Sequence, residues 1–422
     1  MREDFLHHVW KFQLFNFYDL KTTEGHEVRT ISPGIHNLDA GPDFLNARIE
    51  IDGIQWIGNV EIHVNKSDWL KHGHQNDDAY NNLILHLVYN DDYAEIEQLK
   101  NSHTISLKDR INEDIYQRYL KFLNSNLWIP CANFIDGIDR LNLEMWIDRM
   151  MVEKLELKSE SILKSLEKNT FNWEQSFYKF LASNFGFKVN GLAFEMLADS
   201  LPFINILKHK SNILQIEAML YGQAGMLNDD FEDEYPNLLK REYKFLQNKF
   251  QLKPINETAW NWARLRPQNF PTIRISQFAT LIYNNNSLFS ELIFAKSLDE
   301  IRKVLNISTS KYWENHYQFD KESKFRSKKL GKQSIDLLTI NTILPFKFLY
   351  GKIHNNKELT NNALQILEAL PSEKNHIIKG FESLGVVSNS AFRSQALIHL
   401  KKFYCDKKRC LQCGIGNRLL KE

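Results

Sequence analysis

Residues 58–74 read GNVEIHVNKSDWLKHGH, and this stretch decides the fold of the N-terminal part of the chain. Its first seven residues alternate between polar and apolar side chains, and residues 47–52, ARIEID, alternate in the same way. A period of two is typical of strands that bury one face, and Gly53 suits the turn between two such strands. The sequence therefore predicts a β-hairpin. Glu61 and His63 should share one of its faces, because residues i and i+2 of a strand point the same way.

Further elements surround the predicted hairpin. Residues 2–16 carry an apolar stripe with helical spacing, and residues 67–83 favour a second helix that begins at a Ser or Asp cap. Residues 83–89, LILHLVY, are apolar on both faces except for His86, which indicates a strand buried on both sides and a hydrogen-bonded core position for His86. The predicted order is α-β-β-β-α-β, in an α/β domain over residues 1–130.

The apolar pattern changes from about residue 138 to the helical period of 3.6. Strand patterns are scarce there, so residues 131–422 are predicted to form a mostly helical domain that ends in a cysteine-bearing basic tail. The predicted fold class is therefore α+β. The predicted helices lie near residues 143–166, 174–184, 191–200, 238–251, 272–283, 333–350, 359–369 and 389–404.

The composition restricts the class of protein. A chain of 422 residues with 43% apolar and 25% charged residues is typical of a globular protein with two or three domains. The net charge of +1 excludes an overall basic field, so any nucleic-acid surface must be local. The N-terminus lacks a signal-peptide pattern, and no apolar run reaches the roughly 18 residues of a membrane span. With only four cysteines, we expect a cytoplasmic protein without a membrane partner. The oligomeric state stays open.

Asp43, Glu61 and His63 form the candidate catalytic group. Asp43 lies in AGPDF, 18 residues before Glu61, and a hairpin can close that distance. Mg²⁺ and Mn²⁺ suit oxygen ligands, and Mg²⁺ commonly uses only one or two protein carboxylates, so Asp43 and Glu61 are candidate ligands. A bound metal would polarise a phosphoryl oxygen and acidify water. The alternative is that Asp43 is a turn residue and the polar hairpin face simply meets water.

The element order, the Asp of AGPDF and the Glu-x-His of the strand resemble the PD-(D/E)xK restriction-endonuclease-like core. The resemblance implies a metal-dependent nuclease acting on DNA or RNA, in which Asp43 and Glu61 hold the metal and His63 stands near the attacking water. The superfamily normally has Lys where this chain has His63. Lys66 has the wrong strand parity to replace it, and the Q-x3-Y helix motif of RecB-like nucleases is not matched.

The chain also resembles a bacterial family of unknown function over most of its length. That family supplies no activity, so two other functions stay open: a non-catalytic nucleic-acid-binding or scaffold protein with a degenerate core, and a zinc hydrolase that uses the histidines. The resemblance rests on the C-terminal cysteines and on the stretches GPDF (41–44), VEIH (60–63), SDW (67–69), LHLVY (85–89) and RPQNFPTIR (266–274).

Other histidines could contribute to the same site. His72 and His74 are possible zinc ligands, but positions i and i+2 of a helix diverge by about 200°, so both can bind one metal only if the segment is extended. Glu3 and His7 are one helical turn apart and could reach the site from the first helix.

The cysteines form a second candidate metal site. Cys405, Cys410 and Cys413 have the spacing C-x4-C-x2-C, and Cys131 is the only other cysteine. Thiolates so spaced can hold zinc or an iron–sulfur cluster. Some RecB-like nucleases resemble this arrangement of one upstream and three C-terminal cysteines, although the spacing differs and Cys131 follows the predicted core where theirs precedes it. The alternative is a set of reduced thiols.

Two basic segments are candidates for phosphate contacts. The tail includes Lys407, Lys408 and Arg409, and residues 260–276 place three arginines around two prolines. Both segments could bind nucleic acid. The alternatives are a solvated face for the tail and arginines that hold an irregular connection through backbone carbonyls. The three arginines are Arg264, Arg266 and Arg274.

Overall fold

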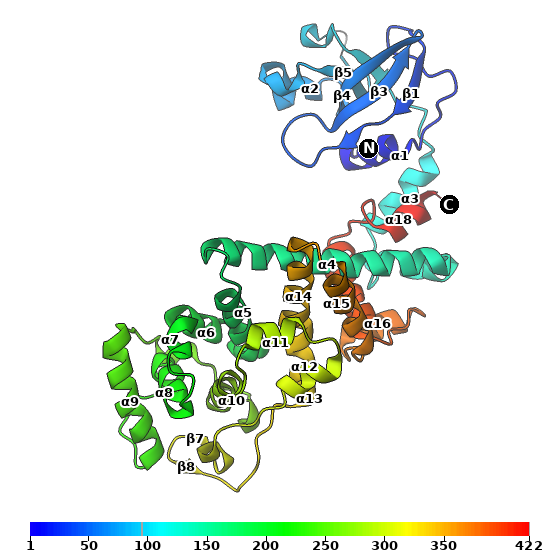
Figure 1. The fold of residues 1–422 in the computed structure, drawn as a ribbon. Coiled ribbons are helices and arrows are strands. Elements are labelled where there is room, and N and C mark those ends of the chain that lie inside the picture. Colours follow the sequence, from blue (N-terminus) through cyan, green and yellow to red (C-terminus); the bar gives the residue numbers. More distant parts are fainter. Residues whose placement is uncertain (94–95, 422) are drawn as a thin grey trace. The chain divides into compact units, whose positions relative to one another are not determined.

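The structure is a computed structural model that describes residues 1–93 and 96–421. It divides into two compact units, one formed by Met1–Trp146 with Leu400–Glu422 and the other by Ile147–His399. The fold is α+β, with an N-terminal sheet followed by a helical region, as the sequence predicts (Figure 1).

The division differs from the predicted boundary at residue 130, which placed the tail in the helical domain. The tail instead belongs to the first unit. The Lys408 ammonium donates to the Leu123 carbonyl at 2.7 Å, and Gly414 lies so close to the Trp146 ring that a side chain there would clash. The local pattern of apolar residues could not predict these contacts, because they join parts of the chain that are far apart in sequence.

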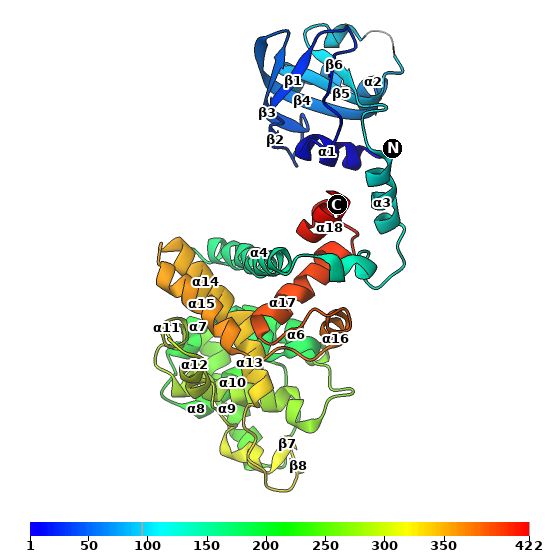
Figure 2. The same cartoon turned by 90° about the vertical axis from the view of Figure 1, so that its right-hand side faces the viewer.

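The first unit contains one mixed sheet whose main strand order is β1-β3-β4-β5-β6, with β2 paired to β3. The pairs β1–β3 and β3–β4 are antiparallel, whereas β4–β5 and β5–β6 are parallel. Helix α1 contacts β4, and α18 lies beside α3 (Figures 1 and 2). The elements are α1 (Glu3–Phe12), β1 (Val28–Ser32), β2 (Ile35–His36), β3 (Phe44–Ile51), β4 (Ile54–Asn65), α2 (Asp68–His72), β5 (Leu83–Asn90), β6 (His103–Ser106), α3 (Glu113–Leu123) and α18 (Gly414–Lys421).

The predicted hairpin is confirmed, because β3 and β4 pair with Ile51 opposite Ile54. The predicted buried strand is confirmed too, since the first six residues of β5 are buried. The expectation that the polar hairpin face meets water is wrong: Glu61 and His63 are only 4% and 1% exposed. Strand β4 is central in the sheet, and both α1 and α2 contact it.

The helix predicted over residues 67–83 is wrong in its length. It ends at His72, because Gly73 adopts a left-handed conformation with φ of 77°. Two short 3-10 segments follow, His74–Asn76 and Asp78–Tyr80.

The second unit is helical apart from the short hairpin β7 (His316–Gln318) and β8 (Lys321–Glu322). In residues 1–93 and 96–421, no helix is long and apolar enough to cross a membrane. The chain from residue 140 to 400 forms α4 (Arg140–Lys168), α5 (Trp173–Phe185), α6 (Phe187–Ser200), α7 (Phe203–Leu207), α8 (Ile213–Gln223), α9 (Glu234–Phe250), α10 (Pro271–Asn284), α11 (Leu288–Ile293), α12 (Leu298–Val304), α13 (Lys332–Leu338), α14 (Leu344–Ile353), α15 (Lys357–Ala369), α16 (His376–Glu382) and α17 (Ala391–Leu400).

Candidate metal centre

Asp43 and Glu61 are held together by the hairpin. The Asp43 backbone N–H donates to Glu61 Oε2 at 3.1 Å, and the Ile62 backbone N–H donates to Asp43 Oδ2 at 2.9 Å. Each carboxylate is therefore fixed by the backbone of the other strand segment. From α1, His7 Nε2 lies 3.2 Å from Asp43 Oδ2, so the first helix does reach this group.

Three histidines gather beside these carboxylates. One ligand nitrogen from each of His63, His72 and His74 can be chosen so that all three lie within 4.8 Å of one another. His63 Nε2 and His72 Nδ1 are 3.1 Å apart. The expected divergence of His72 and His74 does not occur, because the left-handed Gly73 ends the helix between them. Gly73 between the two histidines is the sequence signal that could have indicated this arrangement, since glycine readily adopts a left-handed conformation.

Glu61 faces the same histidine nitrogens. Its Oε1 lies 3.1 Å from His74 Nε2 and 3.7 Å from His63 Nε2. His74 Nε2 is buried and has no hydrogen-bond partner among the described residues, so the short contact to Glu61 lacks hydrogen-bond alignment. The same is true of His7 Nε2 beside Asp43. His74 Nε2 and His7 Nε2 therefore lie close to carboxylate oxygens without being joined to them by ordinary hydrogen bonds, whereas His63 Nε2 is within hydrogen-bond distance of His72 Nδ1.

Burial favours the uncharged forms of His63, His74 and the adjacent His86. Burial and the neighbouring imidazoles lower the pKa of His63 to about 2. Burial, with the charge of Lys66, lowers the pKa of His86 to about 3, and burial also lowers the pKa of His74. Burial and the adjacent Asp43 carboxylate raise the pKa of Glu61. Neutral imidazole is the form that binds metals, and a cation would favour the ionised form of Glu61.

His86 orients His63 from the neighbouring strand. Its Nε2 lies 2.8 Å from His63 Nδ1, which leaves His63 Nε2 facing the cluster. The core position predicted for His86 is confirmed, since it is fully buried. Solvent reaches the centre on its other side, where His72 is exposed. Lys66 does not belong to the centre, because its ammonium pairs with Asp91 at 2.9 Å.

All four cysteines belong to the first unit. All are free thiols, with Cys131, Cys410 and Cys413 buried and Cys405 half-buried. Burial and the neighbouring thiol groups raise the pKa of Cys131 and Cys410 to about 12, and raise the pKa of Cys405 further. Cys131 therefore joins the C-terminal three in space, although it is far from them in sequence. Among residues 1–93 and 96–421, the close group of potential metal-ligand atoms is His63, His72 and His74, and the four sulfurs do not form such a group. Zinc or an iron–sulfur cluster at the cysteines therefore stays a prediction.

A protein-family model described as "Protein of unknown function (DUF2851)" matches residues 3–376. The chain belongs to this family. The resemblance to a family of unknown function is thereby confirmed for nearly the whole chain, and the matched residues end before the C-terminal cysteines. The comparison with curated proteins and the comparison with solved structures each gave no match. The family description assigns no activity, so the chemistry has to be argued from the site itself.

The two basic segments that are candidates for phosphate contacts belong to different units. Lys407, Lys408 and Arg409 lie in the tail of the first unit, where Lys408 is held by the Leu123 carbonyl while Lys407 and Arg409 are exposed. The three arginines at 264, 266 and 274 all line a cavity of the second unit. Arg274 is bonded to side-chain oxygens of Asn269, Gln277 and Ser334 and not to the backbone carbonyls expected from the sequence.

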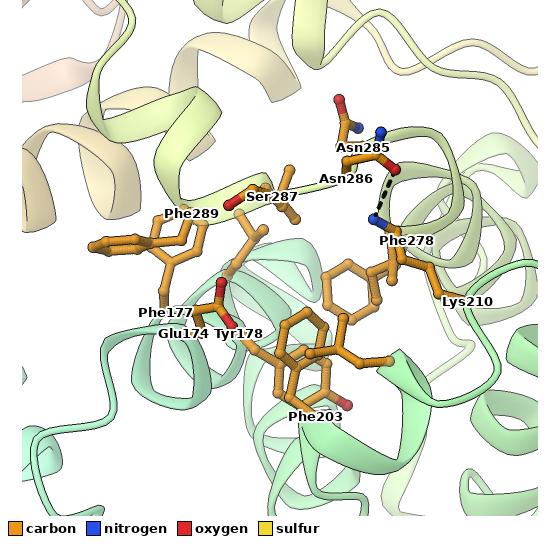
Figure 3. A pocket seen from close by; sticks show the side chains of 14 residues that line it. Glu174, Phe177, Tyr178, Phe203, Lys210, Phe278, Asn285, Asn286, Ser287 and Phe289 are labelled. Atoms are coloured by element: carbon orange, nitrogen blue, oxygen red, sulfur yellow. Dashed lines mark hydrogen bonds between the residues drawn. The ribbon is translucent and has the colours of Figure 1, made fainter.

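A crevice between α5 and α10 carries no function by its dimensions. Figure 3 shows aromatic rings from Phe177, Tyr178, Phe203 and Phe278 around it. Its volume is about 20 Å³, and a single water already needs roughly 10–15 Å³ on this measure. The crevice is a packing gap of the helical core and not a ligand site.

Proposed function

We propose that the chain is a metal-dependent hydrolase that cleaves phosphodiester bonds in nucleic acid. Its metal would be one divalent transition metal bound by His63, His72 and His74, with the Glu61 carboxylate beside them and one position left for a water. The spacing of the ligand atoms carries the proposal. In a tetrahedral zinc site with bonds of about 2.0–2.1 Å, ligand atoms lie about 3.3–3.4 Å apart. His63 Nε2 lies 3.1 Å from His72 Nδ1, and the nitrogens of all three histidines lie within 4.8 Å of one another. Glu61 Oε1 lies 3.1 Å from His74 Nε2 and 3.7 Å from His63 Nε2.

The ligand types favour zinc over magnesium. Imidazole nitrogens suit Zn²⁺ and similar transition metals, whereas Mg²⁺ and Mn²⁺ prefer carboxylate and water oxygens. The Mg²⁺ or Mn²⁺ implied by the nuclease resemblance remains the alternative, with Asp43 and Glu61 as its ligands. In the zinc-binding tautomer, His63 Nδ1–H donates to His86 Nε2 and His63 Nε2 carries the lone pair. A partner on the second ring nitrogen of this kind commonly fixes a metal-binding histidine.

The residues at the rim supply the acid–base chemistry. A metal, when bound, would acidify a water and polarise a phosphoryl oxygen. Asp43 is the group best placed to accept the proton of that water, because its carboxylate adjoins the centre and its side chain is 20% exposed. His7 positions Asp43 from α1 through the 3.2 Å contact. His63 would serve as a ligand in this arrangement and not as the substitute for a catalytic lysine.

The choice of phosphodiester bonds as the substrate rests on the PD-(D/E)xK resemblance together with the order of the helices and strands. The first unit begins α1-β1-β2-β3-β4-α2-β5, which has one short strand more than the α-β-β-β-α-β order that the PD-(D/E)xK resemblance implies. Asp43 immediately precedes one strand of the hairpin, and Glu61 and His63 lie on the other. These are the positions at which the resembled core carries its metal ligands and its water-positioning residue.

A metal-reconstitution experiment tests the function. The full chain would be stripped with EDTA, reloaded with Zn²⁺, Mn²⁺ or Mg²⁺, and assayed on labelled single- and double-stranded DNA and RNA. We expect cleavage with Zn²⁺ or Mn²⁺, and loss of both cleavage and bound metal in His74→Ala. Metal binding without cleavage of any of the four substrates would favour the scaffold function, and no metal binding at all would remove the centre.

A further inference from the structure

The second unit contains a cavity whose charged lining is entirely positive. Its volume is about 730 Å³, within the roughly 300–1,000 Å³ of small-ligand sites. The N-terminal turns of α6 and α10, the connection before α10 and the start of α13 line it. No Asp or Glu is among the lining residues. We name it the cationic cavity. Its lining contains six cationic residues, which are Lys188, Arg264, Arg266, Arg274, Lys329 and Lys332.

None of these six cations forms an ion pair within the described part of the chain. Five of them are exposed around the cavity, whereas Arg274 is only 8% exposed. Like charges gathered in this way repel one another, and the repulsion is strongest where burial excludes water. A ligand with several negative charges would relieve it.

Arg274 is the buried member of the group and has only neutral partners. Its Nη1 donates to Gln277 Oε1 at 2.9 Å, and its Nη2 donates to Asn269 Oδ1 at 2.7 Å and to Ser334 Oγ at 3.3 Å. The Phe187 ring lies 4.6 Å from the guanidinium carbon. Nε is buried without any partner among the described residues. A buried guanidinium with no anion is unfavourable, so the residue is poised for an anionic ligand.

We propose that the cationic cavity binds a small organic polyphosphate of the nucleoside triphosphate type. The arginine forks match phosphate oxygens, and a chain of phosphates can meet several of the cations together. The first turns of α6 and α10 add the partial positive charge of helix N-termini. Apolar lining from Phe187, Phe194 and Leu265 offers a surface for a flat base.

An extended nucleic-acid strand fits the cavity less well. A strand laid across the surface would meet the exposed lysines and arginines, but it would leave the buried Arg274 without its anion. A short, free polyphosphate can enter the cavity. The inference is independent of the proposed hydrolase, because every lining residue belongs to the second unit and the candidate metal centre belongs to the first.

Calorimetric titration of the full chain in EDTA tests the proposal, since EDTA keeps metal-bound nucleotide out of the measurement. The probes are ATP, inorganic tripolyphosphate and a single-stranded 20-mer of DNA. We expect ATP to bind, and the double variant Arg264→Gln/Arg266→Gln to weaken that binding at least about tenfold, since charged hydrogen bonds to phosphate are lost. Arg241→Gln, which removes an exposed arginine outside the cavity, is the matched control and should stay within about twofold of the wild type.

Each outcome decides the proposal. Tripolyphosphate binding as tightly as ATP supports recognition of the phosphate chain, and tighter ATP binding adds the apolar lining to it. No heat with either probe overturns it, and so does equal weakening by Arg241→Gln. Binding of the DNA alone overturns the small ligand in favour of nucleic acid. His74→Ala should keep ATP binding unchanged, so failure of the hydrolase and failure of this site remain distinguishable.

Discussion

Glu61 in the first unit and Glu217 in the second are both buried glutamates, but their oxygens face different partners. Glu217, on α8, accepts hydrogen bonds from the hydroxyls of Tyr235 and Ser276, each at 2.7 Å. Glu61 accepts one backbone hydrogen bond at 3.1 Å, and its other oxygen faces histidine nitrogens without hydrogen-bond alignment. The difference separates a satisfied structural carboxylate from one whose surroundings suit a cation.

The largest expected effect is that zinc raises the free energy of unfolding of the first unit and leaves that of the second unit unchanged. A ligand that binds only the native state at about a thousand times its Kd adds about 4 kcal/mol to the free energy of unfolding. We expect this gain in the transition of the first unit alone, and Glu61→Gln should remove most of it. Scanning calorimetry with and without zinc measures the effect, with Glu217→Gln as the matched control that keeps the full gain. Equal stabilisation of both transitions would contradict the assignment.

Loss of Glu217 should be the next largest effect. Glu217→Ala leaves the hydroxyls of Tyr235 and Ser276 without their acceptor in the core, which should lower the free energy of unfolding of the second unit by about 2–4 kcal/mol. Glu217→Gln keeps an acceptor oxygen and should cost less. Urea unfolding of both variants tests this, and zinc should change neither result. A harmless Glu217→Ala would mean that the carboxylate is not needed for the core.

The pH dependence of the second unit should also report Glu217. Burial raises the pKa of its carboxyl, although the three neighbouring hydroxyls oppose the rise. A raised pKa means that the stabilising, protonated form is fully present below the unfolded pKa of about 4.3 and is lost as the pH rises through the folded pKa. Each pH unit between the two values then costs up to about 1.4 kcal/mol. Glu217→Gln should flatten this decline in melts recorded from pH 4 to 8; an unchanged slope would assign it to other groups.

The smallest expected effect is the loss of zinc affinity when the exposed ligand His72 is removed. We expect His72→Ala to weaken zinc binding at least about tenfold, which corresponds to about 1.4 kcal/mol, without changing the metal-free stability. His26→Ala is the matched control, because His26 is an exposed histidine of the same unit that pairs with Asp52. Competition with a chromophoric chelator measures both affinities. Equal losses in the two variants would exclude His72 as a ligand.

The sequence by itself determined the local elements that carry the site. Alternation around Gly53 predicted the hairpin, and the hairpin predicted that Asp43 and Glu61 lie near each other. The apolar run around His86 predicted its buried strand. These inferences succeeded because strand periodicity and turn chemistry act over a few residues and leave a direct trace in the sequence.

Only the tertiary structure decided which distant groups meet. The conformation of Gly73 and the packing of α2 on β4 turn His72 and His74 toward His63, whereas helical periodicity predicted that they diverge. The central place of β4 buries a face that its sequence pattern marks as polar. The tail joins the first unit, and three segments far apart in sequence supply the cationic cavity. Such contacts depend on the packing of whole elements, and the local order of residues does not record which elements will pack together.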